Sequence, residues 1–295
     1  MTQHTQYTNQ RPVTQSVQTA GLVFLATVVL SGCYVEVVPQ VAPHFIATDT
    51  SAADLHGFST AFLLDTALIP FALSSESPYM IIDPDRYTTP RARAITRALI
   101  EQTTYAYLFD DWDCDAGGYT QTEAEADTTA YDDGYTFVDF SMNAQAKDCA
   151  VRKDGQLHWV NSNLDYNTTG WYDDWAGEIS SINGRLEGQV QIDFADGLMR
   201  HRLVNVQLNN LTGTDFIMTG SSSVLIDDGY ARTSVDLTTP ETIHWALGET
   251  FPYQGQVRLR NNSSWVDLTF ESTGLWRETS SGSSGFWFWS ELGFQ

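Results

Sequence analysis

Lysine is almost absent from this chain, which contains only Lys147 and Lys153 among its 295 residues. Its 15 lysines and arginines are outnumbered by 37 aspartates and glutamates, which gives a formal net charge of -22. Such a surface repels DNA, RNA and anionic lipid headgroups. We therefore expect no nucleic-acid partner. We interpret the acidity as a source of solubility, with attraction of cations or basic partners as the alternative.

The sequence also lacks the short motifs that identify common catalytic sites. It contains no Gly-x-Ser-x-Gly nucleophile elbow, no His-Glu-x-x-His helix and no phosphate-binding glycine loop with lysine. His158, His201 and His244 could act as general bases, but none lies in a recognisable motif. A glycosidase needs only two carboxylates at a suitable distance, and no sequence locates such a pair among 37 acids. We expect a protein that is not an enzyme, with a polysaccharide hydrolase as the alternative.

Before Cys33 the sequence has the layout of an export signal. The first 32 residues contain no Asp or Glu and a single basic residue, Arg11, followed by the apolar run 20–30. A neutral-to-positive start and a short apolar core are typical of a removable signal peptide. The core has about 11 residues, well short of the ~20 that cross a bilayer. The alternative is a buried helix of a cytoplasmic protein.

The segment Leu30-Ser31-Gly32-Cys33 resembles the lipobox of bacterial lipoproteins. This resemblance implies cleavage after residue 32, acylation of Cys33 and a lipid bilayer as partner, with residues 33–50 as a lipidated tether. Several acyl chains on one residue hold a protein essentially permanently on a membrane. In that family an Asp directly after the cysteine marks inner-membrane retention. Tyr34 stands there instead, which favours the outer membrane within the cell envelope.

Once Cys33 is set aside, two cysteines remain, Cys114 and Cys149. An even pair in an oxidising compartment predicts a disulfide. Zinc is the alternative, but two cysteines without nearby histidines do not supply four ligands.

The remaining chain divides into a helical part and a β part. Spacings of three and four between apolar residues predict a helix over 51–73, and Pro90 at a first turn predicts a second helix over 91–102. A Pro- and Ser-containing break over 74–90 is expected between them. We expect residues 51–102 to pack on an antiparallel β domain formed by residues 103–295. The predicted fold is mainly β, an antiparallel meander (open barrel or sandwich) with two short helices near the mature N-terminus.

Alternating apolar residues and Asp-Gly turns indicate the β part. Asp-Gly suits the positive φ angles of tight hairpin turns. A Gly-Gln-apolar-polar-apolar pattern recurs from Gly155, Gly188 and Gly255, at about 33 residues and twice that spacing, and suggests repeated hairpins, with coincidence as the alternative. The four Asp-Gly pairs begin at residues 133, 154, 196 and 228, and the clearest predicted strands are 135–142, 156–160, 188–194, 203–208 and 257–259.

The segment from Cys114 through Gly117-Gly118 to Cys149 has a second resemblance. It is similar to uncharacterised exported β-rich lipoproteins in which a Cys-x-x-Gly-Gly start is closed by a cysteine after the next hairpin. The similarity covers roughly residues 114–188 and implies no activity.

Two groups of residues are candidate binding sites. Trp171, Tyr172 and Trp175 enclose two acids and could stack on a sugar, with packing as the alternative. Asp111, Asp113 and Asp115 alternate as oxygen ligands for calcium would, but they fit an EF-hand poorly, and an exposed acidic loop is the alternative. No other cofactor is expected.

Together these observations predict a membrane-anchored envelope lipoprotein that serves as a binding or structural β platform for an unidentified protein or glycan. The alternative is a carbohydrate-binding module or a hydrolase acting on envelope or extracellular polysaccharide.

Overall fold

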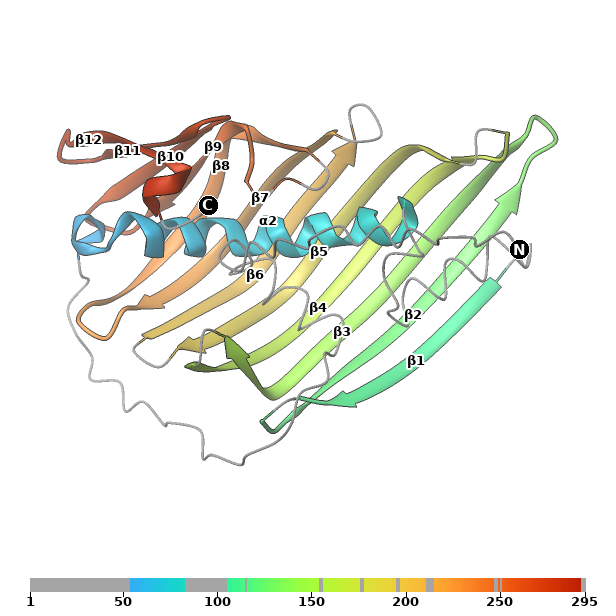
Figure 1. Cartoon of the computed structure of the whole chain (residues 1–295), viewed down its shortest axis with the longest axis horizontal. Coiled ribbons are helices and arrows are strands. Elements are labelled where there is room, and N and C mark those ends of the chain that lie inside the picture. The colour runs from blue at the N-terminus through green and yellow to red at the C-terminus, as the bar shows by residue number, and fades with distance from the viewer. Residues whose placement is uncertain are drawn as a thin grey trace, which may run out of the picture.

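The computed structural model describes residues 54–82, 105–114, 116–153, 156–175, 178–194, 197–210, 215–246, 249 and 251–292. These residues form one α-helix, two 3₁₀ turns and a twelve-stranded antiparallel sheet (Figure 1). The expected signal peptide, Cys33 with its tether, and the helix expected over 91–102 lie outside the described residues.

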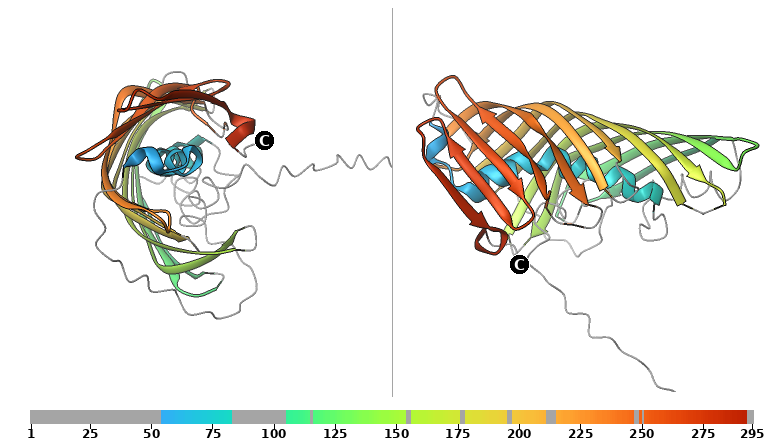
Figure 2. Two further views of the ribbon diagram at one scale, coloured as in Figure 1. Left: turned by 90° about the vertical axis from the view of Figure 1, so that its left-hand side faces the viewer. Right: turned by 90° about the horizontal axis from the view of Figure 1, so that it is seen from above.

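The strands follow one another across the sheet in sequence order, so that every neighbouring pair is joined as a hairpin. The predicted antiparallel meander is thereby confirmed, as a single curved sheet with β1 and β12 at its edges rather than as a sandwich (Figure 2). The five segments predicted as strands lie within β3, β4, β5, β6 and β9. The bounds are β1 Tyr105–Asp113, β2 Tyr119–Ala130, β3 Tyr135–Lys153, β4 Gln156–Asp173, β5 Glu178–Phe194, β6 Gly197–Asn210, β7 Asp215–Asp227, β8 Arg232–Ala246, β9 Gln254–Arg260, β10 Trp265–Glu271, β11 Gly274–Thr279 and β12 Ser284–Phe288.

Two of the four predicted Asp-Gly pairs form described hairpin turns. Gly134 and Gly229 have φ angles of 84° and 82° and connect β2 to β3 and β7 to β8. The side chain of Asp228 accepts hydrogen bonds from the backbone N–H groups of Tyr230 and Ala231, which fixes the second turn. Asp196 and the pair at 154–155 are outside the described residues.

Helix α2 (Thr60–Ile82) lies along the concave face of the sheet, where it contacts β4 to β7 (Figure 2). Over residues 63–73 all of its apolar side chains are buried, and Leu63, Leu64, Ala67 and Phe71 are inaccessible to solvent. A helix without a polar face is typical of a core position. In the described part of the chain, no helix combines the length and apolarity that a membrane span requires.

The helix differs from its predicted bounds at both ends. It begins at Thr60, after the 3₁₀ turn η1 (Leu55–Gly57), and it continues to Ile82. The break predicted from Ser74 is therefore wrong over residues 74–82, and α2 is not short. Ser74 is itself buried. Burial within a tertiary core outweighs the weak preference of serine for turns.

The start of the helix is fastened to the C-terminal strands. Arg277 on β11 donates hydrogen bonds to the carbonyl oxygens of His56 and Phe58 and to the Thr60 hydroxyl, at 3.0 to 3.3 Å. The backbone N–H of Leu55 donates to the Ser264 hydroxyl at 3.1 Å. The helix is thus anchored to strands that follow it by about 200 residues.

Glycines and register shifts bend the sheet around α2. The pairing shifts between Gly188 and Val190 in β5 and between Met218 and Ser221 in β7, next to Gly220. β-bulges of this kind increase local twist and curvature. A Cβ atom on Gly220 would lie 3.0 Å from the Phe71 ring, so this glycine makes room for the helix. Two glycines of the proposed repeat, Gly188 and Gly255, thus lie at bends, because Gly255 is opposite a shift in β8, while Gly155 lies outside the described residues.

Candidate binding site on the convex face

The two faces of the sheet carry different side chains because residues alternate along each strand. On β6, Met199 and His201 are buried on the concave side, where Met199 Sδ accepts a hydrogen bond from Thr66 of α2. Arg200 lies between these two residues and Arg202 follows them, so both arginines lie on the convex side. On the concave side α2 covers β4 to β7, so a ligand is more readily accommodated on the convex side of these strands.

A depression of about 1110 Å³ crosses the convex face over β6 to β9. Arg200 and Arg202 of β6, Arg232 of β8 and Arg260 of β9 line it, and we call it the arginine groove. Ser223, Ser234 and Asn261 add hydroxyl and amide groups to the lining, and Asp236 is its only described acid.

A second depression of about 350 Å³ adjoins the first, because Arg200 and Arg202 line both. It continues over β2 to β6, and its remaining lining is largely amide-bearing. We call it the amide groove and define it by Gln145, Lys147, Asn161, Gln189 and Gln191. Together the two grooves form a polar track across most of the sheet.

Arg200, where the grooves meet, is held in place by its neighbours. Its Nε donates to Gln191 Oε1, and Gln191 Nε2 donates to both carboxylate oxygens of Asp193 at 2.7 and 3.0 Å. Burial lowers the pKa of Arg200, and repulsion by Arg202 and Arg232 lowers it further, against the opposing attraction of Asp193. Burial is also the main cause that raises the pKa of Asp193. The site thus holds several positive charges that repel one another.

Three arginines outside the grooves, Arg185, Arg258 and Arg277, form ion pairs or hydrogen bonds with described groups. Arg258 donates to both oxygens of Asp267 at 2.6 Å and lies over the Trp265 ring. Arg185 pairs with Glu187 at 2.7 Å. In contrast, none of the four arginines of the arginine groove is within ion-pair distance of a carboxylate among the described residues, although Asp227 and Asp236 lie on neighbouring strands.

The candidate aromatic residues do not form one surface. Trp171 is 37% exposed, but its ring contacts Tyr131 and Phe137 at centroid distances of 5.3 and 5.1 Å. Tyr172 lies on the opposite side of the strand and packs against the core. Trp175 is 86% exposed and lies over Gly134, where an added Cβ would overlap the indole.

The candidate calcium ligands are only partly described. Asp111 and Asp113 are exposed on β1, and Asp115 lies outside the described residues. The part of the chain that the structure describes contains no group of three or more His, Cys, Asp or Glu side chains placed to hold a metal. The calcium site stays a prediction.

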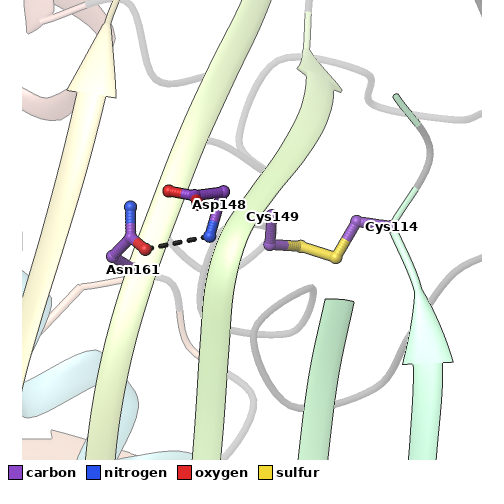
Figure 3. The surroundings of a disulfide bond; sticks show 4 residues. All are labelled: Cys114, Asp148, Cys149 and Asn161. Carbon is purple, nitrogen blue, oxygen red and sulfur yellow. Dashed lines mark hydrogen bonds between the residues drawn. A yellow bond between two sulfur atoms is a disulfide. The ribbon is translucent and has the colours of Figure 1, made fainter. Parts of the chain in front are cut away.

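The sulfur atoms of Cys114 and Cys149 lie 1.96 Å apart and form the predicted disulfide (Figure 3). It ties the end of β1 to β3. The Gly-Gly pair is needed beside it, because a Cβ on Gly118 would lie 2.0 Å from the Asp148 carbonyl oxygen. Asp148 has a φ of 46° and its N–H donates to Asn161 Oδ1 at 2.9 Å, next to the bulge that accommodates Cys149.

Among the candidate bases, His201 is completely buried on the concave side. Its Nδ1 lies 3.1 Å from the Ser222 hydroxyl, while Nε2 has no partner among the described residues. Burial lowers the pKa of His201 to about 3. It is therefore a neutral core residue and faces away from both grooves.

The arginine groove was not predicted from the sequence, although a usable pattern exists. Arg200-His201-Arg202 and Arg258-Leu259-Arg260 each place two arginines two residues apart, hence on one face of a strand. The pairing of these strands through β7 and β8 was not predictable from the residues alone.

The chain matches no protein-family model, no curated protein and no solved structure.

Proposed function

We propose that this protein is a lipid-anchored protein of the cell envelope that presents the convex face of its sheet as a binding platform. The observation that carries the proposal is the contrast between the two faces. On the concave face α2 covers β4 to β7, while the convex face bears two connected polar grooves. Acylation of Cys33, cleavage after residue 32 and outer-membrane location belong to this proposal and are supported by the lipobox resemblance.

The anchor is tested by the Cys33→Ala variant, expressed in the source cell or a Gram-negative host. We expect the wild-type protein in the membrane fraction and the variant in the soluble fraction, because one thiol carries the lipid. A Cys114→Ala variant is the matched control, since it removes a cysteine that is not acylated and should stay with the membrane. Unchanged membrane association of Cys33→Ala contradicts the anchor.

A second candidate function is carbohydrate binding at the corner of the sheet where Trp175 lies over Gly134. The exposed Trp175 ring beside Asp173 and Asp174 favours it, since a flat ring can stack on a sugar. Glycan-array binding by the full-length protein that is lost in Trp175→Ala supports this corner, and binding that persists in this variant excludes it. Release of shorter products from a bound glycan would instead identify a hydrolase.

A further inference from the structure

The charge of the convex grooves is opposite to that of the whole chain. The grooves are lined by five cationic side chains, Lys147, Arg200, Arg202, Arg232 and Arg260, and by a single described acid, Asp236. The chain as a whole has 37 acids and 15 lysines and arginines. Screening at physiological ionic strength limits surface charges to about 8 Å, so a ligand in the grooves experiences these cations and the nearby Asp193, Asp227 and Asp236, but not the acids of the rest of the chain.

The cations are spread out rather than gathered around one point. Three strand spacings separate Arg202 on β6 from Arg260 on β9, which is about 14 Å. Lys147 on β3 extends the positive track further across the sheet. A single phosphate or carboxylate can contact only one or two of these residues, whereas a ligand with repeated anionic groups can contact all of them.

The uncharged residues that line the two grooves favour one class of polyanion over the others. Amides such as Gln145 and Gln189 both donate and accept hydrogen bonds, as sugar hydroxyls do. Single-stranded nucleic acids are instead bound on aromatic stacking platforms, and Tyr119 is the only aromatic residue among the described lining. A membrane is flat and would leave a groove of about 1110 Å³ unfilled.

We propose that the arginine groove and the adjoining amide groove bind an acidic polysaccharide chain, with the anionic groups on the arginines and the sugar hydroxyls on the amides. Guanidinium groups bind carboxylates, sulfates and phosphates through paired hydrogen bonds. Arg200 is preorganised for this contact by Gln191. The inference rests on the proposed function in one respect only, that the convex face is the binding face.

The test measures binding of hexagalacturonate and of a heparin-derived hexasaccharide to the full-length protein by calorimetry. We expect both to bind, and the fully methyl-esterified, uncharged hexagalacturonate not to bind. The double variant Arg200→Gln/Arg202→Gln should weaken binding by at least about tenfold, because two charge-assisted contacts are lost. Asp236→Asn should strengthen binding severalfold, because it removes the one acid in the groove.

Arg185→Gln is the matched control, because Arg185 lies on the exposed face of β5 outside the grooves and is paired with Glu187. It should change affinity by less than about twofold. Urea unfolding of each variant shows whether the fold is retained, and the opposite direction expected for Asp236→Asn cannot arise from misfolding.

Three results would overturn the inference. One is absence of binding to both acidic oligosaccharides. Another is equal weakening by Arg185→Gln and by the double variant. The third is tighter, arginine-dependent binding to oligothymidylate or to phosphatidylglycerol vesicles, which would identify a nucleic acid or a membrane as the occupant. None of these bears on membrane anchoring, which the Cys33→Ala fractionation tests separately.

Discussion

The concave and convex faces of the sheet are made by the same strands, yet they have opposite chemistry. On the concave side, Phe71 of α2 fits against Gly220, and the apolar side chains of the described core are buried. On the convex side, Arg202 and Arg260 remain unpaired within the described structure in a protein of strongly negative charge. If the convex face is the binding face, as proposed, stability and binding depend on different faces, so that substitutions on each should have separable effects.

The largest effect is expected where the helix meets the concave face. Phe71→Ala should lower the free energy of unfolding by about 3–5 kcal/mol, because it removes a fully buried ring and leaves a cavity between α2 and β7. Urea denaturation followed by tryptophan fluorescence measures this loss. Phe288→Ala, which truncates a ring that is 53% exposed, should cost less than about 1 kcal/mol. Equal losses in the two variants would mean that the helix is not a structural core element.

A smaller effect should appear in acid. The pKa of His201 is lowered by burial to about 3 in the folded protein, below the value of 6.5 that applies when the chain is unfolded. The unfolded chain therefore binds the proton first, and stability that is complete above pH 6.5 is lost as the pH falls towards 3. Between pH 7 and pH 5 this residue should cost about 2 kcal/mol.

The measurement compares urea midpoints of the wild-type protein and His201→Gln at both pH values. The variant cannot titrate, whereas the carboxylates titrate in both proteins, so the difference isolates His201. Parallel pH dependence of the two proteins would show that the imidazole is accessible to protons in the folded state.

The smallest effect is expected on the convex face. Arg200→Gln/Arg202→Gln should change the free energy of unfolding by less than about 0.5 kcal/mol per site, because neither guanidinium forms an ion pair with a described carboxylate. The same urea titration measures it. A loss above about 2 kcal/mol would place these arginines in the structural framework and would remove the separation between the faces.

Much of the fold could be predicted because its determinants are local. Alternating apolar residues located β3 to β6, and Asp133-Gly134 located a hairpin turn. The end of α2 could not be predicted, because Ser74 is kept helical by burial that no local pattern reveals.

The candidate site was harder to predict, because its residues are also brought together by long-range contacts. In a chain with an overall charge of -22, acids such as Asp111 and Asp113 were the more obvious candidates for a site. The arginines that gather on the convex face come from β6, β8 and β9 and are up to 60 residues apart in sequence. Trp171 and Tyr172 are adjacent in sequence and lie on opposite sides of the sheet. Pairing between strands, rather than proximity in the chain, decides which residues meet.

The order of elements along the chain also constrains how the protein reaches its native state. The helix is synthesised before every strand that it contacts. Leu55 precedes its hydrogen-bond partner Ser264 by 209 residues. Long-range contacts of this kind make folding slow, because much of the chain must be ordered before they form. The contacts of α2 with β4 to β7 can be complete only after Asp227 has been synthesised, and the ties of its N-terminal end to Ser264 and Arg277 form later still. If the proposed export signal is used, this delay keeps the polypeptide unfolded while it passes through a narrow translocation channel.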